Sequence, residues 1–234
     1  MPKRRLNVLT LLIAFFSGFL IPFVARRLGK ILPTTTGAIL FSLIHIPRFP
    51  KTHNPLRHGL FLRRWKSLCW SAVWVGLLNM ALFFYVNTYF PKEAIPYAYF
   101  FVWILLCAAN VDVRYFILPD CLTIPLMLLG FLFATQTNLI SAEQSVFGAC
   151  FAYMITALSV FCLSFSRQSL FGAGDSKMAI ALGTWLGIQG LNYAIFISFF
   201  LFVLHAYWTK KKYGAYGPAL GLAGLFSFFA LYTK

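Results

Sequence analysis

Long apolar segments, separated by short polar ones, dominate this chain. Runs of roughly 17–25 apolar residues predict helices that cross a membrane, because in hydrocarbon every backbone N–H and C=O group must be hydrogen-bonded within the protein. The pattern therefore predicts an all-α, polytopic integral membrane protein with about eight transmembrane helices. The expected spans are Leu6–Ala25, Leu68–Phe90, Ala94–Val111, Cys121–Leu139, Gln144–Phe165, Met178–Ile188, Leu191–Trp208 and Pro218–Tyr232.

The longest polar stretch, Arg26–Lys66, carries nine basic residues and no acidic one. It divides the chain into three expected parts. Residues 1–25 form a first span, residues 26–67 a basic cytoplasmic loop, and residues 68–234 a membrane-embedded domain.

Composition supports the membrane class and excludes others. Of the 234 residues, 60% are hydrophobic and 11% charged, whereas a soluble domain carries about 25% charged residues. The net charge of +15 does not indicate nucleic-acid binding, because the basic residues gather in short loops between spans. The five cysteines form no Cys-x-x-Cys pair and the four histidines are scattered, so no metal site is expected.

The distribution of basic residues predicts the orientation. If the N-terminus lies outside, fifteen of the twenty Lys and Arg residues lie inside, as the positive-inside rule favours. An extra crossing at Ile31–Pro47 would reverse the first two spans and give the same count. Both topologies place all three aspartates on the cytoplasmic side.

The aspartates are the candidates for chemistry, because a carboxylate near hydrocarbon is costly and is a functional-site hypothesis by default. Asp112 follows an apolar stretch, where pairing with Arg114 is the structural alternative. Asp120 follows Pro119 and precedes an apolar helix, so it is expected to cap that helix. Asp175 ends the glycine-containing segment Gly172-Ala-Gly174-Asp175, which a plain turn between helices also explains.

Aspartyl hydrolysis needs two such acids close together. Side by side, both cannot ionise, so they share one proton; one carboxylate activates water while the other acid protonates the scissile carbonyl. Asp112 and Asp175 lie 63 positions apart on the same predicted membrane face. Gly183-x-x-x-Gly187 and Gly217-x-x-x-Gly221 indicate close helix packing, which would allow the two acids to meet.

The order and spacing of these motifs resemble the prepilin peptidases, the type IV prepilin leader peptidases with a G-x-G-D aspartyl site. The matching elements are Asp112-Val-Arg-x-x-x-Leu-Pro-Asp120-x-Leu-Thr, Gly172-Ala-Gly-Asp175-Ser-Lys-Met, Gly183-Thr-Trp-Leu-Gly187 and Tyr216-Gly-Pro218. They cover about residues 100–222. Ser17-Gly-Phe-Leu, near the end of the first span, also resembles the entry segment of that family.

The resemblance implies that Asp112 and Asp175 are the catalytic pair and that Pro119, Asp120, Gly172, Gly174 and Lys177 support them. It implies cleavage of the basic leader of prepilins or pseudopilins, after a glycine, on the cytoplasmic side of the inner membrane. The expected partners are these substrates and membrane lipids. The peptidase reaction requires no cofactor.

Two alternatives stay open in the sequence. Longer family members also methylate the new N-terminus with S-adenosylmethionine, and many carry two Cys-x-x-Cys pairs after the first span; Arg26–Lys66 has no cysteine. The second alternative is a protein of another functional class, a proton-coupled transporter that would use the three aspartates as a proton relay. That alternative predicts acids near the midplane and paired broken helices.

Overall fold

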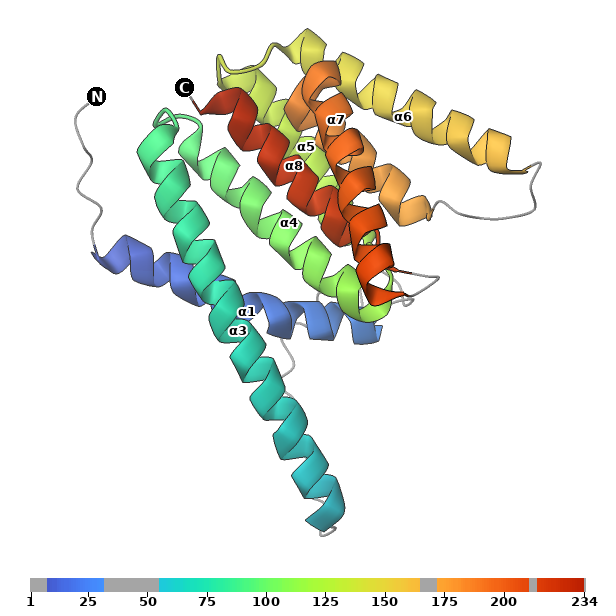
Figure 1. Ribbon diagram of the computed structural model, residues 1–234. Helices are drawn as coiled ribbons and strands as arrows, with labels where there is room; N and C mark the ends of the chain where they lie inside the picture. The colour runs from blue at the N-terminus through green and yellow to red at the C-terminus, as the bar shows by residue number, and fades with distance from the viewer. Residues whose placement is uncertain (1–7, 32–54, 165–171, 211–213, 234) are drawn as a thin grey trace. The chain divides into compact units, whose positions relative to one another are not determined.

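The computed structural model describes residues 8–31, 55–164, 172–210 and 214–233, with backbone alone for 29–31, 55–65 and 162–164. Helices form nearly all of this part of the chain, and no strand occurs in it (Figure 1). The helices are α1 (Val8–Ile31), α3 (Pro55–Tyr89), α4 (Ile95–Tyr115), α5 (Asp120–Gln136), α6 (Ala142–Ser164), α7 (Ala173–Thr209) and α8 (Gly217–Tyr232).

Five of these helices, α1, α3, α4, α6 and α7, are long and apolar enough to cross a membrane, and α5 and α8 are shorter apolar helices. This confirms a polytopic helical membrane protein. The possible crossing at Ile31–Pro47 lies outside the described residues. The predicted division at residues 25 and 67 stays a prediction, and α3 begins at Pro55, before the expected span.

The chain forms two compact units, Met1–Tyr85 and Val86–Lys234. In the first, α1 and α3 approach closely because Gly18 and Gly76 lack side chains: a Cβ on Gly18 would lie 3.0 Å from the Gly76 Cα. Asn79 crosses the same contact and donates from Nδ2 to the Ala14 carbonyl at 2.7 Å. A buried amide that finds a partner between helices stabilises their association in lipid.

In the second unit, α7 packs against α5, α6 and α8, and α4 packs against α5 and α8. An aromatic core joins four of these helices: Phe101, Phe133, Trp185 and Phe228 are all fully buried. The Phe101 ring centroid lies 4.7 Å from that of Trp185 and 4.4 Å from that of Phe228. The indole of Trp185 donates to the Leu126 carbonyl at 2.7 Å, so its one polar group is satisfied.

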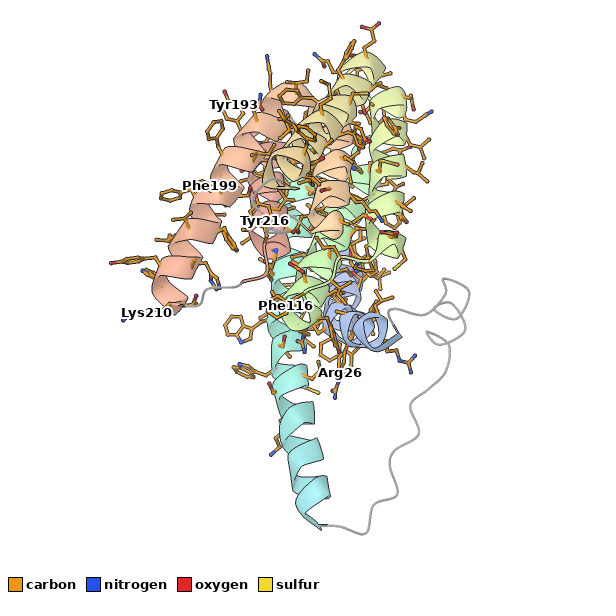
Figure 2. The ribbon with its side chains drawn as sticks, turned by 90° about the vertical axis from the view of Figure 1, so that its right-hand side faces the viewer. Arg26, Phe116, Tyr193, Phe199, Lys210 and Tyr216 are labelled. Atoms are coloured by element: carbon orange, nitrogen blue, oxygen red, sulfur yellow. The ribbon has the colours of Figure 1, made fainter. Side chains whose placement is uncertain are left out.

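Helix α7 contains the break that the sequence predicts between Met178–Ile188 and Leu191–Trp208. Gly187 has φ 62° and ψ −173°, a backbone conformation that is essentially restricted to glycine. Figure 1 shows that α7 turns back on itself, and Gly187 is the residue at which its backbone leaves the helical conformation. The first half, which carries Asp175, therefore lies beside the second half, whose outer face exposes Tyr193 and Phe199 (Figure 2).

Candidate active site

The last turn of α4 carries Asp112. The helix ends because Phe116 adopts the left-handed conformation (φ 54°) and its N–H donates to the Asp112 carbonyl at 2.9 Å. The Asp112 side chain points inward and is only 5% exposed. Its Oδ2 accepts a hydrogen bond from the Gly217 N–H at 2.9 Å, so a buried carboxyl group has a backbone donor at the start of α8.

The first turn of α7 carries Asp175. Gly172 is the N-cap, and its carbonyl accepts the Asp175 N–H at 3.1 Å. The carboxyl group turns back over this glycine, since a Cβ on Gly172 would lie 3.2 Å from Asp175 Oδ2. An acid in a first turn interacts favourably with the helix dipole.

Asp112 and Asp175 lie close enough for their charges to interact. Gly174 explains how the two segments approach: a Cβ on it would lie 2.8 Å from the Leu118 Cβ, in the segment between α4 and α5. Gly174 thus serves close packing, and Gly172 has an ordinary extended backbone conformation (φ −72°, ψ 141°) that does not require glycine. The structure brings together the two acids that the sequence singled out.

Asp120 does not cap α5, which corrects the expectation from the sequence. It is the first residue of the helix, buried Pro119 occupies the N-cap position, and no side chain makes a capping hydrogen bond. Instead, Lys177 Nζ donates to both carboxylate oxygens of Asp120, at 2.6 and 2.7 Å. This ion pair links the start of α5 to the first turns of α7, two residues beyond Asp175. Both side chains are about half exposed, Lys177 47% and Asp120 48%.

Three further residues meet at this place, and the sequence assigned none of them a role beside Asp112. The Gly217 N–H donates to the Asp112 carboxyl group. Tyr216 precedes Gly217 as the N-cap of α8, and its hydroxyl lies 2.6 Å from Ser198 Oγ. The charge of Asp175 acts on Tyr216 as well. The Tyr216-Gly-Pro218 motif marked this helix start, since proline is favoured in a first turn, but only the fold places it against Asp112.

No group of three or more His, Cys, Asp or Glu side chains that could hold a metal ion occurs in the described part of the chain. The chemistry available at this site is that of two neighbouring carboxyl groups, at the ends of their helices and partly shielded from water. Such a pair can take a proton from water and give one to a carbonyl oxygen.

Comparison with known proteins shows which proteins this chain is similar to. Residues 99–207 match the Type IV leader peptidase family. The match includes both acids and the Asp120–Lys177 pair, and it confirms the resemblance that the motifs indicate.

Relatives give the same result over longer alignments. The chain is 31% identical over 185 residues to a prepilin leader peptidase/N-methyltransferase of Dichelobacter nodosus, covering 74% of this chain and 64% of the relative. It is 28% identical over 190 residues to that of Pectobacterium carotovorum (75% and 68%) and 33% over 133 residues to that of Neisseria gonorrhoeae (54% and 45%). The chain thus spans about half to two thirds of these relatives. No solved structure matches the chain.

Proposed function

We propose that the protein is an aspartyl endopeptidase of the bacterial inner membrane that removes the leader from type IV prepilins or pseudopilins. The observation that carries the proposal is that Asp112 and Asp175, at two helix ends, lie close enough for their charges to interact, within the segment that matches the leader peptidases. Partners of this site are membrane-anchored precursors and the surrounding lipids, and no nucleic acid is involved.

In the proposed reaction, the two carboxyl groups hold one proton between them. The ionised group draws a proton from a water molecule, which attacks the carbonyl of the leader's final glycine. The protonated group hydrogen-bonds to the carbonyl oxygen and stabilises the tetrahedral intermediate; a proton then passes to the leaving amine. The pair titrates as a unit, so the two roles belong to the dyad as a whole.

The place of the acids favours hydrolysis at a membrane surface over a proton relay. Asp112 lies in the last turn of α4 and Asp175 in the first turn of α7, not in the middle of long helices. The distribution of basic residues favours the cytoplasmic side for this end of the unit. There the basic leader of a precursor would reach the dyad while its apolar helix stays in lipid.

Isosteric substitution of either acid tests the proposal. Asp112→Asn and Asp175→Asn should each reduce prepilin cleavage by at least about 100-fold, because each removes half of the acid–base pair. The asparagine amide oxygen at position 112 would still accept the Gly217 N–H, so membrane insertion should be unchanged. Leader loss is measured by gel shift in membranes that contain equal amounts of each variant.

Asp120→Asn is the matched control, since it changes the third aspartate without touching the dyad, and its activity should stay within several-fold of the wild type. Normal processing by Asp112→Asn or Asp175→Asn would overturn the assignment.

Methyl transfer is the alternative second activity, because the relatives' printed name includes it. If this chain also performs it, S-adenosylmethionine would be the donor and the new N-terminal residue the acceptor. Mass spectrometry of the cleaved pilin, with and without added S-adenosylmethionine, distinguishes a peptidase alone from a bifunctional enzyme by the mass of one methyl group.

A further inference from the structure

The first turn of α8 meets the dyad through its backbone. The N–H groups at the start of a helix have no acceptor within that helix. Gly217 uses its N–H to bind Asp112 Oδ2 at 2.9 Å, in a buried contact between residues 105 positions apart. The donor at this point comes from a helix start, where the dipole also favours a negative group.

Gly217 has no room for a side chain. A Cβ there would lie 2.6 Å from Asp112 Oδ2 and 3.0 Å from its Cγ. Even the smallest side chain would therefore have to move either the carboxyl group or the start of α8. The hydrogen bond and the missing side chain both fix where the Asp112 carboxyl group lies.

Tyr216 holds this helix start in place. Ser198 Oγ has one proton, which it donates to the Ile195 carbonyl at 2.8 Å. The Tyr216 hydroxyl, 2.6 Å away, is therefore the donor to Ser198 Oγ. Burial raises the pKa of Tyr216 above its usual value, so the hydroxyl keeps its proton at neutral pH. The tyrosine ring also packs edge-on against Phe202, with the ring centroids 5.5 Å apart.

We propose that Tyr216 and Gly217 are positioning residues of the peptidase site. Gly217 orients the Asp112 carboxyl group, and Tyr216, anchored on Ser198, keeps Gly217 at that distance. Ser198 lies in the second half of α7 and Asp175 in the first, so one folded-back helix fixes both acids, one directly and one through α8. This inference rests on the proposed function.

The test compares two identical substitutions one helical turn apart. Gly217→Ala places a methyl group against Asp112, whereas at Gly221 the nearest atom to an added Cβ is the Leu105 carbonyl oxygen, at 3.9 Å. Gly217→Ala should lower kcat for prepilin cleavage by about 100-fold with KM little changed, because small misplacement of a catalytic group has effects of that size. Gly221→Ala should cleave like the wild type. Equal kcat for the two variants would overturn the inference.

A second set of variants is mild enough to keep the fold. Tyr216→Phe and Ser198→Ala each remove one side of the hydroxyl pair, and each should lower kcat by about tenfold, as loss of one hydrogen bond implies. The double variant should be no slower than either single variant, because both remove the same link. Additive losses, or losses that appear in KM alone, would count against a positioning role.

Failure of the proposed function would be recognised separately. If the wild type cleaves no prepilin, the peptidase proposal is wrong. The positioning inference is then tested by the rate at which Asp112 reacts with dicyclohexylcarbodiimide, measured by mass spectrometry. The labelling rate at Asp112 should then differ several-fold between Gly217→Ala and Gly221→Ala. The same rate in both would overturn the inference.

Discussion

The positions of the two acids depend on nearby glycines, because a side chain at these glycines would collide with the acids or their surroundings. Gly172 leaves space for the Asp175 carboxyl group, Gly174 lets the α4–α5 segment approach, and Gly217 does the same for Asp112. A carboxyl group in an apolar setting needs a close donor to be tolerated. Backbone N–H groups supply that donor without a competing charge, as the Gly217–Asp112 bond shows. Glycine is thus used here for close approach to an acid.

Asp120 and Lys177 are expected to act on the site from its edge. Because their ion pair is half exposed, it should contribute less than about 1 kcal/mol to stability. Its effect should instead lie in holding the Asp175 turn. Asp120→Asn and Lys177→Gln should each lower the cleavage rate several-fold, and the double variant should lose no more than either one.

Cleavage assays at low and high salt test this pair, since screening weakens an exposed ion pair. The wild-type rate should fall with salt more than that of Lys177→Gln. Lys210→Gln, which changes an exposed cation at the end of α7, serves as the control. A salt response equal in all three proteins would contradict the expectation.

The reversal of α7 brings together residues of the candidate site that a straight helix would keep far apart. In a straight helix, Asp175 and Ser198 would lie about 34 Å apart, at about 1.5 Å per residue. Yet Ser198 binds the Tyr216 hydroxyl, and the charge of Asp175 acts on the same tyrosine. The reversal at Gly187 makes this possible.

Gly187→Ala should therefore destabilise the protein by about 1–3 kcal/mol, the cost of forcing a side chain into this conformation. The cost comes from the backbone conformation and not from a steric clash, because the atom nearest to an added Cβ would be Ile140 Cδ1, at 3.4 Å. Thermal unfolding in detergent measures the change, with Gly221→Ala as the control in a regular helix. An unchanged melting temperature would show that the reversal does not depend on glycine.

Close packing between helices supports the same arrangement. A Cβ on Gly148 of α6 would clash with the Gly183 carbonyl oxygen, and Ser145 Oγ donates to the Thr184 carbonyl at 2.6 Å beside it. The sequence predicted close packing at Gly183, which is confirmed. On the Gly217-x-x-x-Gly221 face, the tight contact is at Gly217. At Gly221 an added Cβ would meet the Leu105 carbonyl oxygen of α4 at 3.9 Å, so a methyl group would fit there.

In the Val86–Lys234 unit as a whole, the C-terminal end of α4, which carries Asp112, marks the end at which the candidate site lies. Figures 1 and 2 show the C-terminal ends of α4 and α7, marked in Figure 2 by Phe116 and Lys210, toward the same end. The aromatic core of Phe101, Phe133, Trp185 and Phe228 fills the space between the helices. Exposed apolar side chains lie outside this core, among them Phe196, Phe199 and Phe200.

Labelling of single cysteines tests the orientation of this unit. In a background without the native cysteines, Lys210→Cys should react with a membrane-impermeant maleimide only after the cytoplasmic side is opened. Asn138→Cys, exposed in the segment between α5 and α6, should react in intact cells. The reverse pattern would place the dyad on the outer side and contradict cleavage at the cytoplasmic face.

Much of this protein follows from local sequence. Apolar runs determined the helices, because backbone in lipid must bond internally. Asp112 and Asp175 stood out because acids are rare in such a chain, and the break near Gly187 followed from the interruption of the apolar pattern. The ends of the helices were less predictable: α1 continues to Ile31 and α3 begins at Pro55, where charged residues continue the helices beyond the apolar stretches.

The partners of the polar groups could not be read from the sequence. Asp120 looked like a helix cap, because an acid after proline and before an apolar run has that local pattern; Lys177, 57 positions away, is its partner in the fold. Ser198 had no local sign of a role, and neither the Tyr216-Gly-Pro218 motif nor the spacing of Gly217 from Gly221 showed that Gly217 binds Asp112. Their contacts arise only when α7 reverses and α8 packs beside α4, since hydrogen bonds between distant residues depend on how whole helices meet. The sequence by itself determined which helices form and which acids are the candidates for chemistry; the tertiary structure decided what contacts each acid makes, because those contacts depend on how distant helices pack.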